Sequence, residues 1–202
     1  EQHRPNKLYT GISDYLVAHR IPFTMFLSGR FVEDNEAAVK ALSKLDFVEL
    51  ENHSWDHPNR MPRLSDEEVR DEVLKTDDEI ARVTGRSTAF FRFPAITYDA
   101  RTLRDVEALG VVVVHYRWEV GDPDPHETAN RIVSETLEGA RQGDILINHI
   151  NGRGWHTAQA LPRMIAGLQA KGFRFVLLKD YLTAKRSRVV GGAAAGGPSS
   201  GK

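Results

Sequence analysis

Residues Leu50–Pro58 read LENHSWDHP and place two imidazoles, those of His53 and His57, four residues apart. The apolar run that ends at Leu50 predicts a strand, so the histidine pair follows directly after a strand end. Imidazole nitrogens are common ligands of zinc and related metals. The spacing therefore makes His53 and His57 a candidate metal-binding pair.

The composition limits the chemistry that can accompany this pair. The 202 residues contain no cysteine, which excludes disulfides and thiolate metal sites and leaves His, Asp and Glu as ligands. With 27 basic and 28 acidic residues the net charge is −1, without the basic excess typical of nucleic-acid binding. No apolar run reaches the roughly 20 residues of a membrane span. We expect a soluble protein that binds no nucleic acid, and the oligomeric state stays open.

Strand patterns alternate with helix patterns along the chain. The clearest helix begins at Ser65, which forms a capping box with Glu68, and ends at Gly85. Short turns between alternating elements predict a parallel sheet covered by helices, in one domain over residues 1–183. Residues 184–202, rich in Gly, Ala and Ser, are expected to be a disordered tail. Helices are expected at 8–19, 37–45, 66–84, 99–109, 128–140 and 158–171, and strands at 23–27, 47–50, 89–93, 111–116, 144–148 and 173–178.

Two fold classes share this periodicity, the β/α barrel and the open doubly wound sheet. Both place their chemistry at the carboxyl ends of the strands. Polar side chains from four strand ends should therefore meet at one rim, and their coincidence indicates a functional site. These are His53 and His57, then Arg92, then Trp118 and Asp122, then His149 and Trp155.

Four segments resemble a known family in sequence and in order: NHSWDHP (52–58), FFRFPAITYD (90–99), the segment around WEVGDPDP (118–125) and DILINHINGRGWHTAQALP (144–162). They are similar to the second to fifth motifs of the polysaccharide deacetylases, also called the NodB homology domain or carbohydrate esterase family four. The resemblance covers roughly residues 5–182. It implies an α/β fold, a distorted and incomplete β/α barrel. It also implies removal of acetyl groups from N-acetylated sugars with a divalent metal, commonly zinc or cobalt.

The resemblance implies roles in metal binding and proton transfer. His53 and His57 would be the two histidine ligands of the divalent metal, with zinc expected first and cobalt second. His149 would protonate the departing sugar nitrogen, with Asp122 as the residue that orients it.

Further roles follow for residues around the expected rim. Arg92 would pair with an aspartate of the family's first motif. The backbone N–H of Ala95 could contribute to an oxyanion hole. Trp118 and Trp155 would be walls for a sugar ring.

The family's first motif, an Asp-Asp pair ahead of Gly-Pro on the first strand, has no counterpart in this sequence. In the family it supplies one metal ligand and the general-base aspartate. We therefore expect the chain to start downstream of that motif and to lack the first strand of the barrel. Without this strand the edges of its neighbours are exposed, so the fragment would be unstable or completed by a partner chain.

The expected function is metal-dependent hydrolysis of the acetamide of an N-acetylated carbohydrate. Two alternatives stay open. A catalytically inactive carbohydrate-binding barrel would account for the missing base aspartate, and a hydrolase of a non-sugar amide would keep the mechanism with another substrate. The sequence does not choose among chitin oligomers, peptidoglycan and exopolysaccharide. The resemblance suggests a bacterial envelope or secreted setting for a full-length parent.

Overall fold

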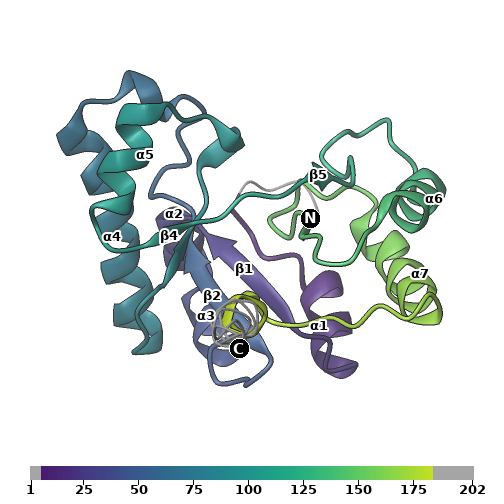
Figure 1. Ribbon diagram of the computed structural model, residues 1–202. Helices are drawn as coiled ribbons and strands as arrows, with labels where there is room; N and C mark the ends of the chain where they lie inside the picture. The colour runs from purple at the N-terminus through teal and green to yellow at the C-terminus, as the bar shows by residue number, and fades with distance from the viewer. Residues whose placement is uncertain (1–5, 184–202) are drawn as a thin grey trace, which may run out of the picture.

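The computed structural model describes residues 6–183, so the expected tail at 184–202 lies outside the described residues. Its main sheet is parallel, and a second parallel pair of strands lies apart from it (Figure 1). In order across the main sheet the strands are β1 (Phe23–Leu27), β2 (Val48–Asn52), β3 (Phe90–Phe91) and β4 (Val112–Val113), and the pair is β5 (Trp118–Glu119) and β6 (Leu146–Ile147).

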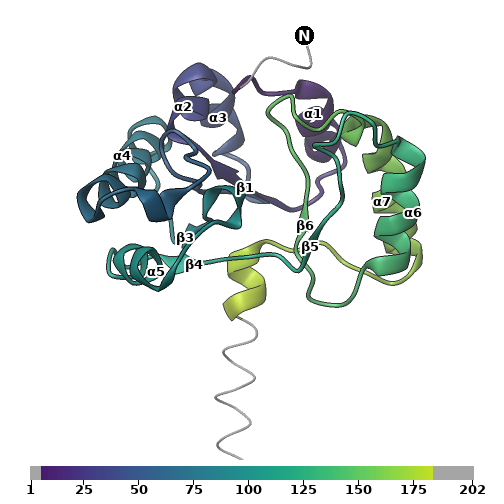
Figure 2. The same cartoon turned by 90° about the horizontal axis from the view of Figure 1, so that it is seen from above.

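The helices form two groups, one beside each sheet (Figures 1 and 2). Short 3-10 turns, η1 (Met61–Arg63) and η2 (Pro94–Ile96), interrupt the loops after β2 and β3. Beside the main sheet lie α2 (Gly29–Asp34), α3 (Glu36–Leu42), α4 (Asp66–Thr84) and α5 (Ala100–Glu107); α6 (Ala129–Gly139) and α7 (Thr157–Ala170) cover the strand pair, and α1 (Thr10–Ala18) packs on α7.

The strands form an open arc. β1 stands at a free edge of the main sheet, and β4 and β5 belong to different sheets. The predicted α/β architecture, parallel strands with helices outside in an incomplete barrel, is confirmed. Periodicity could not distinguish a barrel from a doubly wound sheet, because both repeat the same strand–helix unit.

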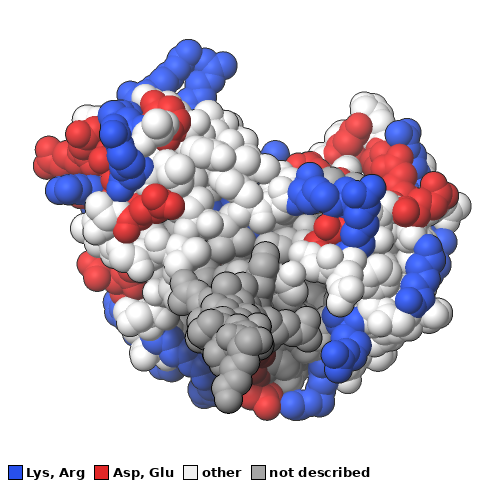
Figure 3. Space-filling view, viewed as in Figure 1, with Lys and Arg blue, Asp and Glu red and all other residues white. Residues whose placement is uncertain are grey.

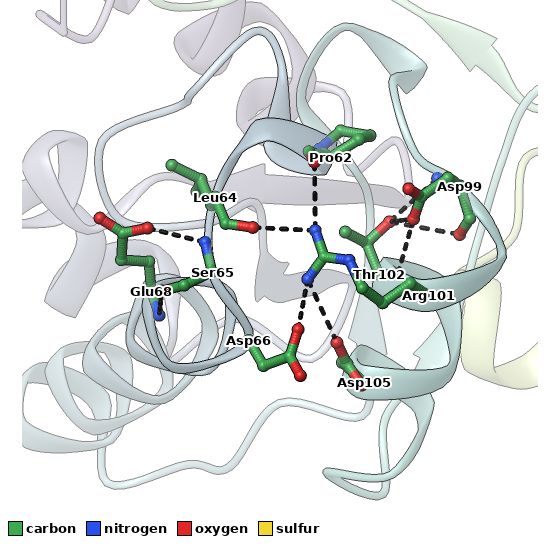
Figure 4. Close-up of polar contacts among 9 residues, drawn as sticks. All are labelled: Pro62, Leu64, Ser65, Asp66, Glu68, Asp99, Arg101, Thr102 and Asp105. Atoms are coloured by element: carbon green, nitrogen blue, oxygen red, sulfur yellow. Dashed lines mark hydrogen bonds and ion pairs between the residues drawn. The ribbon is translucent and has the colours of Figure 1, made fainter.

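Helix α4 supports the middle of the main sheet, and its predicted end signals are confirmed. The Ser65 hydroxyl accepts from the N–H of Glu68 at 3.2 Å, while the Glu68 carboxylate accepts from the N–H of Ser65 at 2.7 Å (Figure 4). Gly85 ends the helix at φ 70°, the left-handed conformation that favours glycine. The predicted apolar stripe of α4 is buried: Val69, Val73, Ile80 and Val83.

Arg101 connects α5 to the segment that precedes α4. Its Nη2 donates to the carbonyls of Pro62 at 3.1 Å and Leu64 at 2.8 Å, and its Nη1 pairs with Asp66 at 2.5 Å (Figure 4). A second carboxylate, that of Asp105, lies 3.6 Å from Nη1. The Arg101 guanidinium thus fixes residues 62–66, which connect the histidine loop to α4.

Some predicted elements differ from the structure. The strand expected at 173–178 is wrong, because those residues form no strand and a helical turn begins at Leu178. The expected strand 111–116 is reduced to two residues, and α2 was not predicted. A strand is defined by a neighbour that accepts and donates its backbone hydrogen bonds, and a local pattern carries no information about that neighbour.

The described surface agrees with the near-zero net charge. Figure 3 shows Lys and Arg interspersed with Asp and Glu over the described atoms of the face in view, which is hollowed between its two halves. Among residues 6–183, no helix has the length and apolarity that a membrane crossing requires.

Candidate active site

His53 directly follows β2 and continues its pairing with β1. Its backbone N–H donates to the Leu27 carbonyl at 2.9 Å, and its ring Nδ1 lies 2.7 Å from the Arg92 carbonyl. Because a carbonyl only accepts, Nδ1 carries the hydrogen and Nε2 keeps the lone pair that a metal needs. Burial, with the nearby charge of His57 as the second cause, lowers the pKa of His53 to about 3. The ring is therefore neutral at physiological pH.

The structure brings His57 next to His53. The two ring centroids are 4.9 Å apart, edge to face, and burial also lowers the pKa of His57. The loop between them is tightly wound, since Ser54 and His57 have φ of 69° and 54°. The N–H of His57 donates to the Ser54 hydroxyl, and the N–H of Ser54 donates to the Asn52 side chain. Two neutral imidazoles thus converge within one turn of chain.

Helix α4 anchors this loop through residues that the sequence reasoning missed. One oxygen of Glu72 accepts from the N–H groups of Trp55 at 2.8 Å and Asp56 at 3.0 Å. The Asn52 amide donates to the Val73 carbonyl at 2.9 Å. The signal for Glu72 was its helical spacing from the buried stripe of α4, which turns its side chain toward the sheet.

Asp122 and His149 come together beyond the carboxyl ends of the parallel strands β5 and β6. Asp122 is fully buried, and its Oδ1 lies 2.8 Å from Nδ1 of His149. Its Oδ2 accepts from the His149 N–H and from the Thr157 hydroxyl, both at 2.6 Å. The carboxylate therefore fixes the His149 tautomer with Nε2 as the nitrogen that exchanges a proton. Thr157 was missed, because nothing in its local pattern distinguishes it from a helix-start threonine.

Arg92 is buried without a full set of partners. Its guanidinium carbon lies 3.9 Å from the Phe26 ring centroid and 5.6 Å from that of Tyr116. Nε donates to the Val114 carbonyl at 3.3 Å, but Nη2 has no hydrogen-bond partner among residues 6–183. Burial lowers the pKa of Arg92 to about 10, so the group stays charged at neutral pH. A charged donor is left unsatisfied beside the histidine pair.

Ala95 lies in η2 with φ 48°, followed by Ile96 at φ 51°. Left-handed backbone is costly for alanine and more so for a β-branched residue, by roughly 1–3 kcal/mol each. Together with Ser54 and His57, these account for four of the six described non-glycine residues with positive φ. Backbone strain of this kind gathers at functional sites.

A cleft of about 1750 Å³ opens between β1 and β6. The backbone N–H of Trp155 donates to the Asp122 carbonyl at 3.1 Å, and Trp118 contributes backbone to β5. Asp122 is fully buried. Of the predicted site residues, five line the cleft: His53, His57, Arg92, Ala95 and His149.

The donor set suits a metal only in part. Two neighbouring histidines with lowered pKa values fit as ligands, and Nε2 of His53 is available because Nδ1 is held by the Arg92 carbonyl, whereas catalytic zinc sites use three protein ligands. Within residues 6–183, no group of three or more His, Cys, Asp or Glu side chains could hold a metal ion.

Comparisons with solved structures match this architecture. A peptidoglycan N-acetylglucosamine deacetylase in complex with a substituted benzamide is 25% identical with a TM-score of 0.81, over 88% of this chain and 83% of that one. A family-four carbohydrate esterase pseudoenzyme from Bacillus anthracis is 23% identical with a TM-score of 0.78, over 88% of this chain and 61% of that one, and shows the fold alone.

Comparisons of sequence lead to the same family. A bifunctional xylanase/deacetylase of Pseudobutyrivibrio xylanivorans is 26% identical over 182 residues, and a peptidoglycan-N-acetylmuramic acid deacetylase of Bacillus subtilis is 25% identical over 184 residues. The matches cover 90% and 88% of this chain but only 29% and 67% of those proteins. The sequence profile described as polysaccharide deacetylase matches residues 3–114, more than half of the sequence. With its histidine pair and its incomplete barrel in place, the chain belongs to the polysaccharide deacetylase family.

Proposed function

We propose that this domain hydrolyses the acetamide of an N-acetylated carbohydrate with the help of a divalent metal. The observation that carries the proposal is that three imidazoles line one cleft: His53, whose ring is neutral with Nδ1 held by the Arg92 carbonyl, His57 beside it, and His149, held by a buried carboxylate. The cleft thus offers separate residues for two requirements of metal-dependent amide hydrolysis: His53 and His57 for metal binding, and His149 for proton delivery.

The protein's own groups have definite tasks in this scheme. His53 and His57 would hold the metal, zinc by preference and cobalt as a second choice, which would polarise the acetyl carbonyl and acidify a water. His149 would deliver a proton from Nε2 to the leaving amine, while Asp122 holds the ring and stabilises its positive charge. The N–H of Ala95 is a candidate donor to the developing oxyanion.

The substrate class comes from the relatives. Their names include deacetylases of peptidoglycan N-acetylglucosamine, peptidoglycan N-acetylmuramic acid and chitooligosaccharides. All three are N-acetylated glycans, and an open cleft accommodates a chain of sugar rings better than a closed pocket does. We infer an N-acetylated glycan as the substrate, with Trp118 and Trp155 proposed to contact a sugar ring.

The test is acetate release from an N-acetylglucosamine oligomer. It is run on this chain and on the same chain extended upstream by an acidic strand, because residues 6–183 hold no group of three or more His, Cys, Asp or Glu side chains that could bind a metal. The zinc-loaded extended protein should release acetate, and EDTA should abolish the release. His149→Ala should lower kcat by about 10²-fold or more with zinc retained, whereas the exposed His126→Ala should have no effect. Acetate release that survives EDTA, or a fully active His149→Ala variant, would contradict the proposal.

A second candidate is a glycan-binding barrel without catalysis. The observation that favours it is the incomplete donor set, two histidines with no third ligand among residues 6–183. Oligosaccharide binding without acetate release, in both the chain and its extended form, would establish this function in place of hydrolysis.

A further inference from the structure

The loop that joins the two histidines is held from two sides. From α2, the N–H of Gly29 donates to the Ser54 carbonyl at 3.0 Å, and the N–H of Arg30 donates to the Trp55 carbonyl at 3.3 Å. From α4, the Glu72 carboxylate accepts from the Trp55 N–H at 2.8 Å. Both backbone groups of Trp55 are therefore bound, each to a different helix.

The Trp55 indole occupies the space where any other residue at position 29 would have its side chain. A Cβ built on Gly29 would lie 2.0 Å from Cε3 of Trp55, 2.5 Å from Cζ3 and 2.7 Å from Cδ2. Carbon atoms that pack together lie roughly 3.5–4.0 Å apart. Gly29 is also buried, so a side chain there could not turn to solvent. A residue with a side chain at this position must therefore displace the indole.

The backbone of Gly29 does not itself require glycine. Gly29 is the first residue of α2, and it is not among the glycines with positive φ. Positive φ is the usual reason for a glycine, because the Cβ of other residues clashes in that conformation. The contact with Trp55 is thus the feature that excludes a side chain at position 29.

The residue after Gly29 contacts the same loop. The Arg30 guanidinium carbon lies 5.6 Å from the Trp55 ring centroid, within the range of a cation–π contact, and its Nε donates to Oδ1 of Asp56 at 2.7 Å. Trp55 is therefore held by its N–H, its C=O and its ring together. A displacement of the indole is then transmitted to the loop on either side of it, and so to His57.

The histidine pair tolerates little displacement. The ring centroids of His53 and His57 are 4.9 Å apart, and each histidine lies two residues from Trp55. A working set of functional side chains has to be held to within about 0.5 Å. A Cβ at position 29 requires a shift of about 1.5 Å, from the 2.0 Å approach to an ordinary carbon–carbon contact. The required shift exceeds the tolerance.

We propose that Gly29 is a positioning residue for the histidine pair. Its missing side chain makes room for the Trp55 indole, and this contact fixes the place of His57 relative to His53. Gly29 itself touches neither histidine ring and acts through Trp55. The inference rests on the metal-binding role proposed above for the two histidines.

The test is Gly29→Ala, measured in two ways. In the metal-free protein, the ring signals of His57 in nitrogen NMR should move from their wild-type positions. In zinc titration by calorimetry, the Kd should rise by about 10- to 100-fold, the usual cost of disturbing a residue that supports a metal ligand.

Gly11→Ala is the matched control, because Gly11 lies at the start of another helix, α1, and also lacks a positive φ. A Cβ there meets the Tyr9 ring at 3.2 Å, which a shift of a few tenths of an ångström relieves. The His57 signals and the zinc Kd should stay as in the wild type.

A second substitution separates positioning from damage to α2. Trp55→Ala removes the indole and leaves the backbone bonds of the loop, so Gly29→Ala/Trp55→Ala should show the His57 signals and the zinc Kd of Trp55→Ala alone. If Gly29→Ala does not fold, recovery of the fold in the double variant supports the proposal.

Two results would overturn the proposal. One is a Gly29→Ala protein with wild-type His57 signals and zinc Kd. The other is a double variant that is as defective as Gly29→Ala, because the defect would then not come from the contact with Trp55. A wild-type protein that binds no zinc would instead reject the metal-dependent function, and the His57 signals of the metal-free variants would still decide the role of Gly29.

Discussion

At the residue scale, the rings of His53 and His149 are oriented in the same way, by an acceptor that holds Nδ1. A backbone carbonyl fixes Nδ1 of His53, and a buried carboxylate fixes Nδ1 of His149, so each ring directs Nε2 toward the cleft. The two partners differ: a neutral carbonyl holds the ring of His53, which is proposed to bind a metal, whereas a carboxylate holds and orients the ring of His149, which is proposed to deliver a proton.

Asp122→Asn should therefore disturb proton delivery and leave the metal pair intact. The amide can present its N–H₂ to Nδ1, which forces the hydrogen of the neutral ring onto Nε2. Nitrogen NMR of His149 should show the tautomer reversed, and kcat in an active form should fall by about 10²-fold or more. Thr157→Val should have a smaller effect on kcat, because it removes one hydrogen bond to Oδ2 of Asp122 and keeps the contact between Oδ1 and Nδ1 of His149. An unchanged His149 spectrum in Asp122→Asn would remove Asp122 from this role.

Asp77 gives a pH dependence of stability with a definite sign. Burial raises its pKa above the ordinary 3.8, although the Asn52 amide at 2.6 Å and the Thr88 hydroxyl donate to it. The folded protein then holds this proton more tightly than the unfolded chain, so its contribution to stability falls as pH rises from about 4 through the raised pKa. Asp77→Asn removes this contribution and keeps an acceptor. Urea unfolding at pH 4 and pH 7 should show the free energy of unfolding of Asp77→Asn rising relative to that of the wild type as pH rises; a relative fall would contradict the sign.

At the element scale, end signals and buried stripes determine what the sequence can predict. The capping box at Ser65 and the glycine at Gly85 are local, and they predicted α4 to within a residue. The strand expected at 173–178 has an equally clear pattern, yet its existence depends on a distant neighbour. The histidine pair was predicted from spacing and the rim from the strand-end rule. The helical spacing of Glu72 indicates that it faces the sheet but not which loop it holds, and no local pattern encodes the contact of Thr157 with Asp122.

Arg101 supplies the prediction at this scale. Arg101→Ala should lower the free energy of unfolding by about 1–2 kcal/mol, because two carbonyls and an exposed ion pair lose their donor. Arg104→Ala, an exposed change on the same helix, should cost little by urea titration. Arg101→Lys should recover only part of the loss, since an ammonium lacks the planar fork. Equal free energies of unfolding for Arg101→Ala and Arg104→Ala would show that the Arg101 contacts drawn in Figure 4 do not stabilise the fold.

At the scale of the whole molecule, the strands form an open arc, and its free edge, β1, borders the cleft that contains the candidate site. The helix groups on either side hold β1 and β6 apart (Figure 2), and the cleft between them ends at the histidine pair. The incomplete barrel and the incomplete donor set thus occur in the same place.

Zinc titration by calorimetry tests the central claim, that the rim of the arc is a metal site built on His53 and His57. Wild-type protein should bind one zinc ion, and the His53→Ala/His57→Ala double variant should bind it at least about 10²-fold more weakly, with His126→Ala unchanged as the matched control. Circular dichroism establishes that the variants remain folded. The same Kd in the double variant and the wild type would contradict the account, because the two neutral imidazoles would then have no part in holding the metal.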